Sequence, residues 1–133
     1  MIAVAVAAAM STGDGSWTLA AVAGWTPAGQ VRDGLRAAAE FPGGADPVVV
    51  AAAVGSGLRI SAPDTVPYAL WCAARHPNDL VATLWTTASA GGDVDTTCAV
   101  AGGVVGARTG LSGVPGVWRE RCESPPGRVD RWG

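Results

Sequence analysis

The sequence has 133 residues and a formal net charge of −2, and 49% of its residues are apolar whereas 15% are charged. This length accommodates one domain with a single hydrophobic core, and a charged fraction below the usual value of about a quarter predicts that some apolar surface faces a partner. The arginines are scattered along the chain and form no basic stripe, which argues against nucleic acid as a partner.

The first ten residues, MIAVAVAAAM, are apolar on every face, which predicts a helix that is buried on all sides. The stretch has no basic flank and is too short to span a bilayer, so we expect no membrane segment; a signal peptide is the less favoured alternative. Residues 12–26 contain three glycines and predict a loop, with a short helix near Leu19–Ala23.

Four helices are predicted between this loop and residue 90, each with apolar residues at helical spacing and with proline or a capping residue near its start. They cover Pro27–Glu40, Val48–Val54 after Pro47, a stretch that starts near Pro63 or Pro67 and ends at His76, and Asn78 to about Ala88. The third of them ends at His76 because the residue before a proline disfavours the helical conformation.

The last predicted helices follow a glycine break at residues 91 and 92. Asp93–Arg108 is predicted to be a long helix of small residues that ends at Gly110, and a final helix carries Trp118. The tail 124–133 is rich in proline and glycine and is predicted to be flexible. Since no stretch shows a convincing alternation of period two, the sequence predicts an all-α fold.

Three glycines, Gly102, Gly103 and Gly106, lie inside the long helix, where each costs about 1 kcal/mol relative to alanine. This cost is offset where the backbone packs more closely than larger side chains would permit. We therefore expect this helix to be central in the fold and its N-terminus to be rigidly placed.

The segment GGDVDTT, at the start of this helix, places two carboxylates two residues apart with hydroxyls directly after them. Mg²⁺ prefers oxygen ligands in octahedral geometry and takes few carboxylates from one segment. Asp93, Asp95 and Thr96 are therefore candidate magnesium ligands, and Gly91 and Gly92 permit a close approach of the backbone to a ligand. The alternative is that Asp93 is simply a helix N-cap, which the spacing alone favours over a metal site.

The stretch from Asp64 to Pro115, which contains GGDVDTT and the small-residue helix, resembles the carboxy-terminal region of the ADP-ribosylglycohydrolase family. A weaker similarity runs back through GLRIS to AVAVAAAM. The resemblance implies a compact orthogonal helical bundle over residues 1–123 and a pair of Mg²⁺ ions that Asp93, Asp95 and Thr96 help to bind. It also implies hydrolysis of the glycosidic bond between ADP-ribose and a protein side chain, so ADP-ribose or an ADP-ribosylated protein is the expected partner.

Family members hold the remaining metal ligands in an amino-terminal motif of Thr-Asp-Asp type, which this sequence does not contain; its one early acidic residue is Asp14. The sequence therefore resembles the carboxy-terminal half of a family member. We assign no catalytic residue and expect the chain to be inactive by itself, with a complementary amino-terminal half or another copy of the chain completing the site. The alternative is a non-catalytic helical module, or a truncated relic, that binds a partner protein.

Several other residues invite a functional interpretation. His76 precedes a proline at a helix end, where a structural role is favoured over a catalytic one. Trp71 and Trp85 are candidates for stacking on adenine, although core packing is the expected role of aromatic residues at helical spacing. Cys98 is expected to be buried and Arg59 to be a surface charge. The three cysteines lack a CxxC pattern, which predicts neither a zinc site nor disulfides and favours a cytoplasmic protein.

Overall fold

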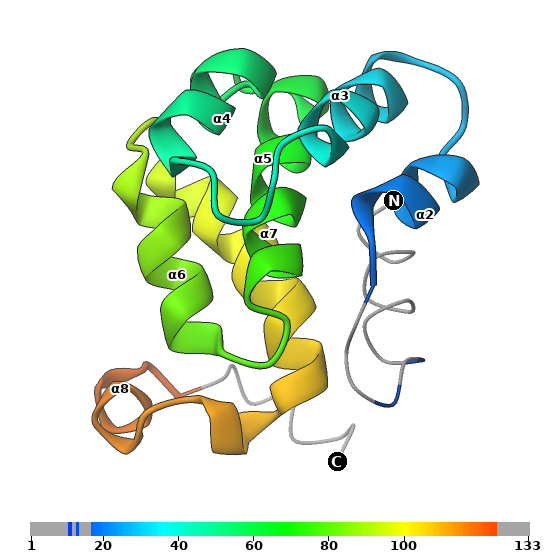
Figure 1. Ribbon diagram of the computed structural model, residues 1–133. Coiled ribbons are helices and arrows are strands. Elements are labelled where there is room, and N and C mark those ends of the chain that lie inside the picture. Colours follow the sequence, from blue (N-terminus) through cyan, green and yellow to red (C-terminus); the bar gives the residue numbers. More distant parts are fainter. Residues whose placement is uncertain (1–10, 12, 14–16, 125–133) are drawn as a thin grey trace.

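Figure 1 shows the computed structural model of the chain, which describes residues 11, 13 and 17–124. The described residues form seven α-helices and one short 3₁₀ helix and contain no strand, which confirms the predicted all-α fold. The helices are α2 (Leu19–Trp25), α3 (Gln30–Ala39), α4 (Pro47–Val54), α5 (Ala62–Arg75), α6 (Leu80–Ser89), α7 (Val94–Thr109), η1 (Leu111–Gly113) and α8 (Gly116–Arg121). Among these described helices, none is long and apolar enough to cross a bilayer. The predicted helix at residues 1–10 and the tail from residue 125 onward lie outside the described residues.

The centre of the bundle is α5, against which α2, α3, α4, α6 and α7 all pack. Every residue from 65 to 73 in this helix is buried. The Tyr68 hydroxyl donates to the carbonyl oxygens of Thr86 and Thr87, at 3.1 and 3.0 Å, which ties α5 to α6. The surrounding helices each contribute fully buried side chains to the same core: Val22, Leu35, Val50, Thr83 and Val104.

Two prolines lie in α5, which begins at Ala62. The sequence left open which of them starts the helix, and both lie inside it. Pro63 occupies the first turn, where an N–H group has no helical partner, and Pro67 removes only the bond to the carbonyl four residues earlier. Gly34 of α3 packs directly on this site, because a Cβ atom there would lie 2.6 Å from Pro67 Cγ.

The start of α3 was predicted too early, since the helix begins at Gln30 and not at Pro27. Thr26 precedes the proline and is extended, with φ −84° and ψ 133°, as a residue before proline prefers. Gly29 then takes the N-cap position. The predicted boundaries of α4, α6 and α7 agree with the structure to within two residues.

The long helix α7 packs against both α5 and α6, as expected of a central helix (Figure 1). The prediction of close packing at all three of its internal glycines was wrong for two of them, Gly103 and Gly106. A Cβ atom at Gly102 would lie 3.1 Å from Leu84 Cδ2 of α6, whereas no atom of the described residues lies within 4 Å of such a Cβ at Gly103 or Gly106. The reason is that α5 and α6 cover other faces of α7, which leaves Gly103 exposed.

Candidate metal-binding site

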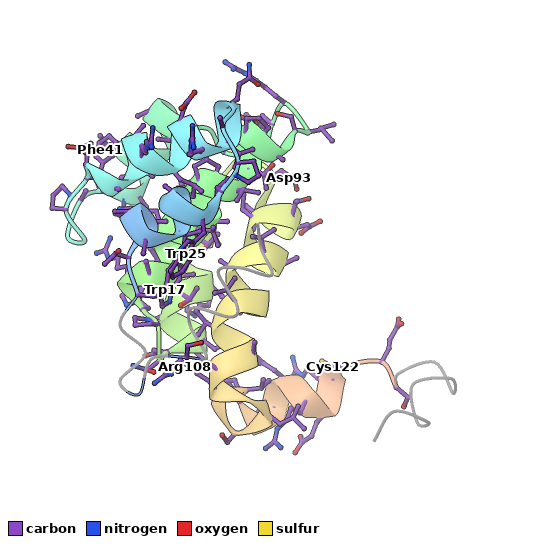
Figure 2. All side chains as sticks on the ribbon, turned by 90° about the vertical axis from the view of Figure 1, so that its right-hand side faces the viewer. Trp17, Trp25, Phe41, Asp93, Arg108 and Cys122 are labelled. Carbon is purple, nitrogen blue, oxygen red and sulfur yellow. The ribbon has the colours of Figure 1, made fainter. Side chains whose placement is uncertain are left out.

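The candidate site lies at the N-terminus of α7, where Asp93 is the N-cap (Figure 2). Its Oδ1 accepts a hydrogen bond from the backbone N–H of Thr96 at 3.2 Å. The hydroxyl and the backbone N–H of Thr96 lower the pKa of the Asp93 carboxyl below its usual range. The N-cap interpretation of Asp93 is therefore confirmed, and it leaves open a second role for the same carboxylate.

A second loop, which connects α4 to α5, packs against this N-terminus. The backbone N–H of Asp93 donates to the carbonyl oxygen of Ser56 at 2.9 Å. Gly92 has a φ of 78°, and a Cβ atom there would collide with the Ser56 carbonyl. Gly57 has a φ of 89°, and a Cβ atom there would lie 2.9 Å from Asp93 Cβ. Both positions favour glycine, because Gly92 meets the Ser56 backbone and Gly57 packs against the Asp93 side chain.

A groove of about 300 Å³ lies beside Asp93. Asp93 and Thr96 form its polar edge, while Val66 and Val100 belong to its apolar wall. The remaining lining residues are Ile60, Ser61, Ala62 and Thr65. The exposed lining is mostly apolar, so the groove favours an apolar surface of a ligand, with the Asp93 and Thr96 oxygens at its edge.

Ile60, which lines this groove, has an unusual backbone conformation. It is 89% exposed and has a φ of 52°, in the left-handed region that a β-branched residue rarely adopts. Residues held in such conformations cluster at ligand sites, because the surrounding structure must enforce them. The conformation of Ile60 therefore indicates that the surrounding residues fix the backbone of this loop.

The donor chemistry at this site fits a hard cation. Asp95 and Thr96 are exposed and Asp93 is partly exposed, so two carboxylates and a hydroxyl are available to solvent within one helical turn. Oxygen ligands of this kind suit Mg²⁺. No group of three or more His, Cys, Asp or Glu residues that could hold a metal occurs among the described residues.

A family model described as ADP-ribosylglycohydrolase matches residues 1–132. The chain belongs to the ADP-ribosylglycohydrolase family. Three relatives, each called ADP-ribosylhydrolase ARH3, match over 77 residues: the Mus musculus protein is 39% identical, and the Homo sapiens and Bos taurus proteins are 38% identical. Each match covers 50% of this chain and 21% of the relative, so the chain spans about a fifth of the length of these relatives. No solved structure gives a significant match.

Within this ADP-ribosylglycohydrolase fold, only two of the three predicted ligands line the groove. Asp93 and Thr96 line the groove, whereas Asp95 is exposed beside it. The sequence did not single out Thr65 or Val66, which also line the groove. The sequence signal nearest to them is the pair of glycines at residues 55 and 57, which indicates a tight loop between α4 and α5.

The other residues considered from the sequence have structural surroundings. His76 caps α5, its Nε2 pairs with Thr86 Oγ1 at 3.0 Å, and burial and the Arg75 charge lower its pKa. Trp71 is 3% exposed and belongs to the core, whereas Trp85 is exposed, contrary to the core packing expected of it. Cys98 is partly buried, and burial followed by the Asp95 charge raises its pKa.

Proposed function

We propose that this chain forms the metal-binding part of an ADP-ribosylglycohydrolase that removes ADP-ribose from modified protein side chains. Family membership supports the reaction class. The observation that carries the proposal is the group of oxygen donors at the start of α7, beside a groove of about 300 Å³. Asp93, Asp95 and Thr96 would hold Mg²⁺ from one side, as part of its octahedral shell.

The chain prepares this site through its own contacts. The hydrogen bonds from Thr96 lower the pKa of the Asp93 carboxyl and fix its orientation. The positive end of the α7 dipole stabilises both carboxylates, but it also opposes a bound cation. We therefore expect weak Mg²⁺ affinity from the three donors alone and a much higher affinity once the opposite side of the shell is supplied.

The groove is small and mostly apolar. Ligand pockets usually measure about 300–1,000 Å³, so this groove lies at the small end of the range and has room for part of a nucleotide. When bound, a pair of Mg²⁺ ions provides Lewis-acid stabilisation of the charge that develops as the glycosidic bond breaks. We assign no general acid or base to this chain; a carboxylate of the complementary half would serve as the base.

The metal-binding step is tested by isothermal titration of Mg²⁺ into the purified chain and into its Asp93→Ala and Asp95→Ala variants. The matched control is Asp79→Ala, because Asp79 caps α6 as Asp93 caps α7, with a 2.9 Å bond from Ala82 N–H. We expect the wild type and the control to bind and the two site variants to lose binding. Equal binding by Asp93→Ala would refute the assignment of the ligands.

The hydrolytic step is tested by combining the chain with the amino-terminal portion of a family member. An ADP-ribosylated protein is then incubated with the mixture in Mg²⁺ or in EDTA. We expect release of ADP-ribose that depends on Mg²⁺ and on Asp93. If the chain binds Mg²⁺ but no mixture releases ADP-ribose, the proposed metal site stands and the proposed hydrolytic activity is wrong.

A second candidate is a non-catalytic helical module that binds a partner protein. It is favoured by large apolar side chains that solvent reaches: Trp25 is 63% exposed, Trp85 69% and Leu111 74%. Thermal unfolding separates the two candidates, because a ligand that binds only the folded state raises the melting temperature. A melting temperature that Mg²⁺ leaves unchanged in both the wild type and Asp93→Ala would favour the module.

A further inference from the structure

Asp64, in the first turn of α5, is linked to the candidate metal ligands by a continuous path of hydrogen bonds. Its Oδ2 accepts from the backbone N–H of Arg59 at 2.8 Å, and its carbonyl oxygen accepts from the backbone N–H of Gly57 at 3.0 Å. The residue before Gly57 is Ser56, whose carbonyl oxygen accepts from the backbone N–H of Asp93 at 2.9 Å. One residue thus holds both ends of the turn that meets the N-terminus of α7.

The turn between these bonds needs such support. It contains Ile60 at a φ of 52°, and the Ile60 N–H donates to the carbonyl of Gly57 at 3.0 Å. A strained residue of this kind persists only where its surroundings enforce the conformation. A hydrogen bond to a carboxylate is stronger than one between neutral groups, so the Asp64 carboxylate is a strong constraint on this turn.

Asp64 faces a different space from the one that the metal ligands line. It lines a cavity of about 430 Å³ together with Gln30 and Arg59, whereas Asp93 and Thr96 line the groove, and Ser61 borders both spaces. A Cβ atom at Gly55 would collide with this carboxylate. These contacts separate Asp64 from the ligand set.

We infer that Asp64 is a positioning residue for the metal site: it holds the 56–60 turn, and the turn holds Asp93 in place. The effect of Asp64 on metal binding rests on the proposed function. The effect of Asp64 on the position of Asp93 does not depend on a metal. Asp64→Asn keeps an oxygen that can accept from Arg59 N–H and removes the charge, whereas Asp64→Ala removes the acceptor altogether.

The first test needs no metal. Amide hydrogen exchange is measured by NMR on the wild type, Asp64→Asn, Asp64→Ala and the control Asp79→Ala, which loses an N-cap carboxylate at the opposite end of α6. We expect Asp64→Ala to raise the exchange rate of the Arg59, Gly57 and Asp93 amides about tenfold, the effect of losing one hydrogen bond to a charged group. Asp64→Asn should largely restore the wild-type rates. An unchanged Asp93 amide in Asp64→Ala overturns the inference.

The second test uses Mn²⁺ alone as a paramagnetic substitute for Mg²⁺, because both ions accept carboxylate and hydroxyl ligands. Mn²⁺ should broaden the amide signals of residues 93–97 in the wild type, in Asp64→Asn and in Asp79→Ala, and should broaden them at about tenfold higher concentration in Asp64→Ala. Equal loss in Asp64→Asn and Asp64→Ala would make Asp64 a ligand and overturn the inference.

The two proposals fail in different ways. If Mn²⁺ broadens residues 93–97 equally in the wild type and Asp64→Ala, the positioning role is wrong and the proposed function stands. If Mn²⁺ broadens no residue of the wild type, the proposed metal site is wrong, and the inference about metal binding falls with it. A change of melting temperature in Asp64→Ala without a change at Asp93 would show a purely structural role and would also overturn the inference.

Discussion

Replacing Gly57 by alanine tests how the two loops build the site. Gly57 has a φ of 89°, and an alanine in the left-handed region costs about 1–2 kcal/mol. The new Cβ atom would also lie 2.9 Å from Asp93 Cβ and 3.5 Å from Thr97 Cγ2. Overpacking of this kind costs about 1–3 kcal/mol, so we expect a total loss of about 2–5 kcal/mol in the free energy of unfolding.

The assay is thermal unfolding followed by circular dichroism, beside urea unfolding at a fixed temperature. For a domain of this size, 1 kcal/mol corresponds to about 4 °C, so Gly57→Ala should melt about 8–20 °C below the wild type. Because the strain falls on Asp93, the variant should also lose Mg²⁺ binding before it loses its helical spectrum. A melting temperature within about 2 °C of the wild type would refute the backbone contact between the two loops.

Other substitutions test the remaining parts of the fold and site. Gly103→Ala should stabilise α7 by about 1 kcal/mol, since alanine favours a helix and no described atom lies near the new Cβ; urea unfolding measures it. Leu35→Ala should cost about 2–5 kcal/mol in the same assay, because Leu35 is fully buried. The lowered pKa of Asp93 gives stability that is present above the unfolded pKa and is lost as the pH falls. The free energy of unfolding should therefore fall more steeply from pH 5 to about pH 3 in the wild type than in Asp93→Asn; parallel profiles would contradict this.

The helices could be predicted because their signals are local. Asp79 and Asp93 precede apolar stretches and cap α6 and α7, and glycine or proline ends each helix near its predicted position. The start of α3 was missed because Pro27 is compatible both with the first turn of a helix and with the bend that precedes Gln30. Local chemistry could not decide between the two.

The site itself was only half predictable. Asp93, Asp95 and Thr96 are close in sequence, so their proximity follows from one turn of helix. The contact between Ser56 and Asp93 joins residues far apart in the chain and depends on how α5 packs against α7. Sequence patterns carry no direct signal for that packing, which is why Ser56 and Asp64 were not identified. The exposed Gly103 shows the converse error, since an intrahelical glycine alone does not reveal which face a neighbour covers.

The most direct test of the central claim is isothermal titration of ADP-ribose into the chain in Mg²⁺ and in EDTA, beside Asp93→Ala, with light scattering to record the oligomeric state. The proposed site predicts binding that requires both Mg²⁺ and Asp93. Binding that is the same in EDTA or in Asp93→Ala, or no binding by a folded chain in Mg²⁺, would contradict the claim that these residues form an ADP-ribose site with a metal ion.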